Sequence, residues 1–317
     1  KVQNLVKIFQ QTSWQMIGKV VTAGSTFVTL GIITRHYGEF GTGVFTLALT
    51  YLNMFFLLAD FGLNAHLLRV MEPLDKKEQQ LLWRKLLGTR LLWASTLVAV
   101  SILLLPAIKL ASGQFVNLVI LGSLMIVGSS IFLTTNLLFQ KSFRYDLSVI
   151  TSSLGALISL GLIFWFARAG ALLEFLILAQ LCSWILMALL ALGMVKRYFQ
   201  TISPILDSKF LLGEIKNTWP IGITLILNVI YFRADAFLIA YFKGIADAGI
   251  YNLSYAVFQS ALVLPTFIMN AYYPMMLKSL KGIRLVGLTL FLLASLGSIL
   301  TLILAPFITN LLSGGGF

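Results

Sequence analysis

Hydrophobic residues along this chain gather in long stretches that short polar segments separate. Nine stretches reach the roughly 20 residues that a helix needs to cross a bilayer. Their approximate ranges are 14–33, 43–63, 90–111, 115–138, 147–167, 171–195, 219–241, 249–270 and 284–305. Buried helices of a soluble protein could imitate one or two such stretches, but not nine. The pattern predicts an all-α, polytopic membrane protein.

Polar side chains recur on one face of the first two stretches. In the second, Thr46, Asn53, Asp60 and Asn64 are spaced by sevens and a four, which places them on one helical face. The first stretch carries a similar stripe, formed by Thr12, Gln15, Lys19, Thr22, Ser25, Thr26 and Thr29. Such residues either join packed helices by hydrogen bonds or line a polar cavity. Stripes on several helices favour a shared cavity.

Composition and charge agree with a membrane protein. Hydrophobic residues make up 59% of the chain and charged residues 11%, with a mean hydropathy of +0.94. The net charge of +12 is unevenly placed: with the N-terminus inside, only Arg35, Lys109, Arg168 and Lys243 fall in outer segments. The positive-inside rule accounts for this asymmetry. We therefore expect a cytoplasmic N-terminus and a protein of the cell (inner) membrane, and we expect no nucleic-acid partner.

One segment of the chain recurs in similar form. GEFGTGVFTL begins at Gly38 and GIADAGIYNL at Gly244, 206 positions later. The same offset maps the polar face of the second stretch onto Asn252, Gln259, Thr266 and Asn270. It maps four residues of the first stripe, Thr12, Thr22, Ser25 and Thr29, onto Thr218, Asn228, Tyr231 and Asp235. Six helices separate the copies, so the halves should be parallel repeats about an axis along the membrane normal.

The repeat suggests a domain division. We expect a six-helix bundle over residues 1–200, a cytoplasmic linker over 201–218, and the first three helices of an incomplete second bundle over 219–317. Two polar segments, from Pro73 and from Ser203, are predicted to be helices at the membrane interface. Asp75 and Glu78 have the spacing of a capping box in the first of them, and Trp83 would suit the headgroup region.

Three segments of the chain match the pattern of a known family: HYGEFGTGVFTLALTYLNMFFLLADFGL, RADAFLIAYFKGIADAGIYNLSYAVFQ and LFQKSFRYDLSVITSSLGAL. In these segments the chain resembles the polysaccharide-biosynthesis flippases of the multidrug/oligosaccharidyl-lipid/polysaccharide exporter superfamily. It implies two pseudo-symmetric six-helix bundles around a central cavity, and the outward flipping of undecaprenyl-linked oligosaccharide for cell-surface polysaccharide. The implied partners are this lipid-linked oligosaccharide of the undecaprenyl pyrophosphate type and the membrane lipids. A polysaccharide polymerase and glycosyltransferases are further candidate partners.

Four charged residues lie inside the predicted spans: Lys19, Asp60, Arg233 and Asp235. A charge at a helix centre costs roughly 2.5–3.5 kcal/mol on insertion scales, so it normally faces a cavity or a partner. Lys19 and Asp60 lie at similar shallow depths on neighbouring antiparallel helices, which predicts an ion pair between them. Arg233 suits a pyrophosphate by its chemistry and Asp235 suits the cavity by its position. They lie roughly 200° apart around the helix, so only one of them should face the cavity.

The predicted substrate-binding residues are Lys19, Thr22, Thr26, Asn53, Asp60, Asn228, Arg233, Asp235 and Gln259. We expect no catalytic residues, metal site or cofactor, because nucleophile–base, metal-ligand and phosphate-loop patterns are missing from the sequence. A drug/cation antiporter or a lipid II flippase of the same superfamily is the alternative function. A membrane polysaccharide polymerase or ligase is disfavoured, because every predicted outer loop is too short to carry an enzymatic site.

Overall fold

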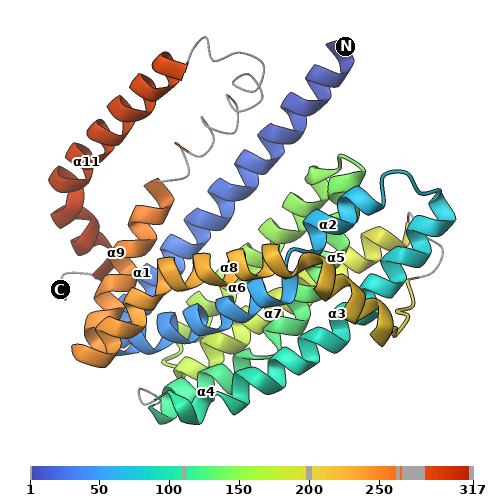
Figure 1. The fold of residues 1–317 in the computed structure, drawn as a ribbon. Helices are drawn as coiled ribbons and strands as arrows, with labels where there is room; N and C mark the ends of the chain where they lie inside the picture. Colours follow the sequence, from blue (N-terminus) through green and yellow to red (C-terminus); the bar gives the residue numbers. More distant parts are fainter. Residues whose placement is uncertain (1, 109–111, 198–201, 262–264, 266–282, 314–317) are drawn as a thin grey trace.

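The computed structural model describes residues 2–108, 112–197, 202–261, 265 and 283–313, and within these ranges the ordered elements are helices (Figure 1). They are α1 (Val2–Asp60), α2 (Leu63–Val70), α3 (Lys76–Leu103), the short 3-10 helix η1 (Leu105–Ala107), α4 (Gly113–Gly122), α5 (Met125–Lys141), α6 (Tyr145–Arg168), α7 (Leu173–Lys196), α8 (Ser208–Phe242), α9 (Ile245–Ala261) and α11 (Ile283–Ser313). We call α1–α7 the first half and α8, α9 and α11 the second half. The all-α prediction is confirmed.

Seven helical segments of the described chain are long and apolar enough to cross a membrane. This number and the predicted nine spans agree once two details are considered. The first two predicted spans share α1, which breaks at Gly38, where φ is 65° and ψ is −168°. We call the parts before and after Gly38 the first and second segments of α1. The eighth predicted span begins as α9, and most of its remainder lies outside the described residues.

The two copies of the repeated segment turn at equivalent glycines. Gly38 divides α1, and Gly244, with φ of 114°, separates α8 from α9. A positive φ is easily adopted only by glycine, so each copy uses its first glycine to reverse the chain. The repeat read from the sequence is therefore a repeat of local backbone structure.

The two halves meet closely along the second segment of α1 and α9. A Cβ atom on Gly43 would lie 2.0 Å from the carbonyl oxygen of Ile245, and one on Gly249 would lie 2.6 Å from that of Glu39. Ile245 and Gly249 are the repeat partners of Glu39 and Gly43, so the contact is reciprocal. The side-chain amide of Asn252 donates to Oγ1 of Thr46, its own repeat partner, at 3.1 Å. An approximate two-fold axis between the halves would give this pattern.

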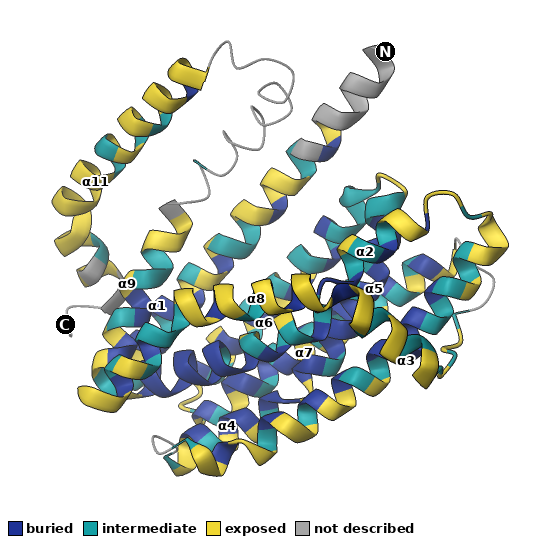
Figure 2. Ribbon diagram, in the orientation of Figure 1, coloured by how far each residue is buried: buried dark blue, intermediate teal, exposed yellow. Residues whose placement is uncertain are grey.

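The buried core lies mainly in the first half, around the second segment of α1 (Figure 2). Phe45, Leu52 and Phe55 of that segment pack with Leu118 of α4 and Ile177 of α7. By contrast, α11 is exposed along most of its length. It meets the rest of the molecule near α1, where the guanidinium of Arg35 donates to the carbonyl of Leu311.

The two predicted interface helices are helical, but each continues into a membrane span. The Asp75–Glu78 capping box is confirmed at the start of α3, which then runs unbroken to Leu103. Trp83 corrects the sequence prediction: it is fully buried and its indole N–H donates to the carbonyl of Thr134, 3.0 Å away. A buried partner for the indole N–H has replaced the headgroup contact expected of an interfacial tryptophan.

Within the predicted linker, α8 begins at Ser208. Residues 202–207 run along α3. The backbone N–H of Ile205 donates to the carbonyl of Arg84, and a Cβ on Gly88 would lie 2.1 Å from the carbonyl oxygen of Ile205. The Lys85 ammonium lies 3.0 Å from the carboxylate of Asp207, which also caps α8. The division into a 1–200 bundle, a linker and a second bundle stays a prediction.

The first part of α8 lies against the first half (Figure 1). A Cβ on Gly62 would meet the side chain of Ile221, and one on Gly222 would meet the ring of Phe61. The imidazole of His66 on α2 lies 3.4 Å from the carboxylate of Glu214. Farther along α8, Ala236 and Ala240 are buried in the core around the second segment of α1, and the helix ends before the Gly244 turn, where α9 begins.

Candidate functional site

A polar pocket lies within the first half, between both segments of α1, α6 and α7. We call it the first-half pocket, and its volume is about 260 Å³. Its lining residues are Thr22, Ser25, Thr26, Thr29, Leu30, Phe45, Leu49, Asn53, Phe56, Ala156, Ser159, Gln180 and Trp184. Three of the predicted substrate-binding residues, Thr22, Thr26 and Asn53, are therefore brought together here.

Hydroxyls of the first segment of α1 differ in how they are satisfied. Thr22 and Thr26 each donate to a carbonyl one turn earlier, of Gly18 and Thr22, at 2.8 and 2.9 Å. No hydrogen bond joins the side chains of Ser25 or Thr29 to another described residue, although both are buried. The hydroxyls of Ser25 and Thr29 are left to whatever fills the pocket.

A second pocket separates the first segment of α1 from α9. We call it the inter-half pocket; it holds about 190 Å³ and is lined by Ala23, Thr26, Phe27, Ala256, Gln259 and Ser260. Thr26 lines both this pocket and the first-half pocket. The amide of Gln259 donates to the hydroxyl of Tyr255 at 3.2 Å. The structure therefore brings Thr26 and Gln259, one from each half, to one space.

A third pocket lies between α8 and α9. This second-half pocket has a volume of about 460 Å³ and is lined by Tyr231, Phe232, Asp235, Tyr251, Ser254, Tyr255 and Phe258. The hydroxyl of Tyr251 donates to the carboxylate of Asp235. The Arg233 guanidinium lies over the ring of Tyr255, 4.4 Å from its centroid. Asp235 and Tyr251, two of the polar lining residues, are thus paired with each other.

The first-half and second-half pockets occupy repeat-related positions. An offset of 206, the separation of Thr46 and Asn252, carries one lining onto the other at five positions. The pairs are Ser25 with Tyr231, Thr26 with Phe232, Thr29 with Asp235, Phe45 with Tyr251, and Leu49 with Tyr255. The two halves therefore place a pocket at the same site of the repeat and line it with different chemistry.

The charged residues behave differently from the sequence predictions. Asp60 pairs with Arg90 of α3, whose Nη2 lies 2.8 Å from Oδ1 of Asp60. Arg90, which begins the predicted span 90–111, is buried. Lys19 is exposed on the first segment of α1, and its expected role as the partner of Asp60 is taken by Arg90. Arg90 and not Lys19 pairs with Asp60 because α3 packs against α1 and brings Arg90 to the carboxylate.

Asp235 lines the second-half pocket and Arg233 does not, in line with the expectation that only one of them faces a cavity, although both contact side chains of α9. Their partners Tyr255 and Tyr251 lie one turn apart on the same face of α9. The length of the arginine side chain overcomes the angular separation on α8. Asn228 is exposed on α8 and lines none of the three polar pockets. The stripe positions Thr266 and Asn270 fall outside the described residues.

Sequence reasoning missed three lining residues of the first-half pocket: Ser159, Gln180 and Trp184. The hydroxyl of Ser159 is buried and has no hydrogen-bond partner among the described residues. Ser148, Ser152 and Ser159 are spaced by four and seven and so share one face of α6, and Gln180 and Trp184 are four apart on α7. These short polar faces were the available signal.

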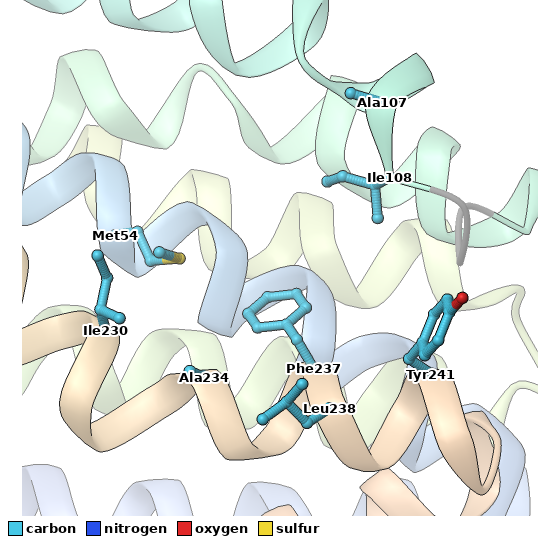
Figure 3. Close-up of a pocket in the computed structure, with 8 residues that line it drawn as sticks. All are labelled: Met54, Ala107, Ile108, Ile230, Ala234, Phe237, Leu238 and Tyr241. Carbon is cyan, nitrogen blue, oxygen red and sulfur yellow. The ribbon is translucent and has the colours of Figure 1, made fainter.

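A larger cavity lies on the other side of the second segment of α1, and its lining is almost entirely apolar (Figure 3). It holds about 600 Å³ between Met54 of α1, Ala107 and Ile108 after α3, and five residues of α8. The hydroxyl of Tyr241 is the one oxygen shown on its lining side chains (Figure 3). Such a lining suits hydrocarbon and offers little to a sugar or a phosphate.

The described residues hold no group of three His, Cys, Asp or Glu side chains that could bind a metal ion. Cys182, the single cysteine of the sequence, is exposed on α7. What the pockets can do chemically is bind polar, hydroxyl-rich or charged groups inside a helical membrane bundle.

The chain was compared with solved structures, curated proteins and protein-family models. The structure is similar to a solved inward-facing conformation of a multidrug resistance MATE family transporter of the MOP superfamily, with a TM-score of 0.66. The match covers 92% of this chain and 72% of that chain at 13% sequence identity, so it shows the fold alone. No curated protein matches the sequence. The family model described as "Polysaccharide biosynthesis protein" matches residues 8–280. This multi-pass membrane chain belongs to the polysaccharide biosynthesis protein family.

Proposed function

We propose that the protein is a flippase that moves undecaprenyl pyrophosphate-linked oligosaccharide outward across the cytoplasmic membrane. The observation that carries the proposal is the set of polar pockets inside an apolar helix bundle, at repeat-related places in both halves. Family membership supports the same reading. No covalent step is required, because the job is translocation.

The physical difficulty of this job is the headgroup. A glycan with a pyrophosphate cannot cross about 30 Å of hydrocarbon unaided, since each buried polar group without a partner costs free energy. Hydroxyl and amide side chains at Thr22, Thr26, Asn53 and Gln259 can replace water as partners of sugar hydroxyls. Lys19 and Arg233 supply cations for the pyrophosphate; Lys19 is exposed at its site.

Movement of the halves follows from where they touch. One close contact between the halves, formed by Gly43, Gly249, Thr46 and Asn252, lies within about two helical turns of the Gly38 and Gly244 turns. A second joins α8 to the first half at Gly62 and His66 and would have to loosen during the movement. Farther from those turns, the inter-half pocket opens between α1 and α9. We place the first contact at the outer side of the membrane and the opening at the inner side, as for a substrate that enters from the cytoplasm. Rocking about the first contact would give alternating access.

The apolar cavity beside α8 (Figure 3) gives the hydrocarbon a place separate from the polar pockets. It would take part of the polyprenyl chain while the headgroup occupies the polar space. The second segment of α1 separates the two, with Met54 facing the apolar cavity and Asn53 the first-half pocket. One helix thus divides tail from headgroup.

The experiment is transport in proteoliposomes. Purified protein is reconstituted with a lipid-linked oligosaccharide, and the headgroup exposed on each leaflet is measured with an added glycosidase that cannot cross the membrane. We expect protected headgroups to become accessible in vesicles with protein and to stay protected in empty vesicles. A protein that leaves the headgroups protected but exchanges cationic dyes for protons or sodium would instead be the antiporter alternative. Lipid II as the added lipid tests the remaining relative.

A further inference from the structure

The first-half pocket gathers polar groups that have no partners. No hydrogen bond joins Ser25, Thr29, Asn53, Ser159 or Gln180 to another described side chain or backbone group. Ser25, Thr29 and Ser159 are only 8%, 6% and 4% exposed. A buried polar group without a partner destabilises the fold, so such groups are normally satisfied by water or a ligand. Three of these side chains are buried, Gln180 is half-buried and Asn53 is exposed. Their convergence from three helices on one pocket indicates a binding site.

The lining specifies a neutral ligand. None of the described residues that line the pocket is ionisable, so it offers no countercharge to a pyrophosphate or a cation. Hydroxyls and amides both donate and accept hydrogen bonds, as the hydroxyls of a sugar do. The rings of Phe56 and Trp184 meet edge to face at 5.1 Å and supply aromatic surface. A pyranose presents C–H groups on its faces, which pack against the negative face of an aromatic ring.

The second-half pocket provides an internal comparison. There the repeat partner of Thr29 is Asp235, and it already accepts a hydrogen bond from Tyr251. Arg233 already lies over Tyr255. Asp235 is thus paired within the second half, whereas its repeat partner Thr29 has no hydrogen-bond partner among the described residues. Of the two pockets, the first-half pocket therefore has the polar groups that are available to a neutral ligand.

Size and access limit the ligand. A volume of about 260 Å³ admits a single sugar ring with some water, and not a whole oligosaccharide. Thr26 lines both this pocket and the inter-half pocket, so the two pockets lie next to each other at this residue. A glycan held between α1 and α9 could therefore place one ring in the first-half pocket.

We propose that the first-half pocket is a subsite for one neutral sugar residue of the transported glycan, and that Ser159 and Gln180 determine its specificity. The proposal rests on the proposed flippase function and adds to it a division of labour. The first-half pocket reads the identity of one sugar, while the charged groups outside it hold the pyrophosphate.

The test measures binding in detergent solution with the whole chain. The probes are polyprenyl pyrophosphate without sugar and the same lipid carrying one hexose, N-acetylhexosamine or hexuronic acid. Dissociation constants are obtained by titrating each lipid against thermal unfolding. We expect wild-type protein to bind one neutral-sugar lipid more tightly than the sugarless lipid, with no such gain for the hexuronic acid.

The variants are Ser159→Ala and Gln180→Met, with Ser95→Ala as the control, because Ser95 is exposed on α3 and bonds its own helix. Each pocket variant should weaken binding of the neutral-sugar lipid by roughly 3- to 10-fold, the loss of one neutral hydrogen bond, and leave the sugarless lipid unchanged. Neither should lower the unfolding temperature of the free protein, since the replaced groups lack partners there.

Four results would overturn the proposal. The first is a wild-type protein that gains no affinity from any neutral sugar, and the second is a pair of pocket variants that bind every lipid as wild type does; either would leave a pocket that holds only water. Equal loss of affinity for sugared and sugarless lipids would make Ser159 and Gln180 structural. Failure of wild-type protein to bind any of the lipids would remove the flippase proposal itself, and the subsite with it.

Discussion

The Asp60–Arg90 pair supports a sharp prediction about stability. Arg90 is 1% exposed, and the side chain of Asp60 is 24% exposed. Two guanidinium nitrogens of Arg90, Nε and Nη1, have no hydrogen-bond partner in the described structure, so the Asp60 carboxylate is its main compensation. Replacing Asp60 by Ala would leave a buried, unpaired cation. Breaking a buried pair in this way costs roughly 3–5 kcal/mol.

The double variant separates the pair from its parts. In Asp60→Ala with Arg90→Met the buried charge is gone and the methionine fills most of the space, so we expect much of the single-variant loss to be recovered. Lys216→Met is the matched control, because Lys216 is an exposed cation on α8. It should change the unfolding temperature little.

Thermal unfolding in detergent, followed by tryptophan fluorescence, provides the measurement. We expect Asp60→Ala to melt several degrees below wild type and the double variant to lie between them or above. An Asp60→Ala protein that melts with wild type would refute the reasoning that Arg90 depends on this carboxylate. A double variant whose loss equals the sum of the single losses would show that the two residues act independently.

Three further predictions concern contacts seen in the fold. Gly43→Ala should destabilise the protein by roughly 1–3 kcal/mol or more, because the new Cβ would lie 2.0 Å from the Ile245 carbonyl oxygen; Gly24→Ala, with nothing within 4 Å, should be harmless in the same melting assay. A protein with Trp83 as its single tryptophan should resist quenching by brominated lipids, since Trp83 is fully buried, whereas one with only Trp165, 64% exposed on α6, should be quenched. The Phe210 N–H and Lys85 lower the pKa of Asp207 below its usual value. The stabilisation by ionised Asp207 is therefore complete above about pH 4 and is lost as the pH falls through the lowered folded-state pKa. Acid should open the 202–207 segment of wild type to proteolysis. In Asp207→Asn the cleavage rate should not depend on pH.

Much of the fold could be predicted because it depends on local chemistry. Apolar length sets the membrane spans, and the glycines of the repeated segment mark turns at Gly38 and Gly244. The Asp75–Glu78 spacing placed the start of α3 correctly. The polar stripe of α1 identified residues that do share a pocket, because side chains on one helical face stay together whatever the helix packs against.

Partners across helices could not be predicted in the same way. Depth and charge favoured Lys19 for Asp60, but Arg90 enters from α3, whose position depends on tertiary packing. Trp83 has the amphipathic character of an interfacial residue, yet the Thr134 carbonyl satisfies its N–H inside the bundle. Ser159 and Gln180 line the same pocket from α6 and α7. Which polar residues of those helices face α1 depends on how the helices pack, and the sequence of one helix does not show this.

The repeat gains its functional meaning from the way the two copies differ. Duplication gives both halves the same glycine turn and the same pocket position. In the second half, tyrosines, an aspartate and an arginine bind one another, which favours a unit that stays rigid when it moves. In the first half, serines, a threonine and amides remain unpaired beside Trp184 and Phe56. The proposed flippase function needs unpaired polar groups to hold a hydrated ligand and paired polar groups to keep a moving half rigid. The repeat allows the two halves to differ in this way while the contact of Thr46 with Asn252, about which they would move, is kept.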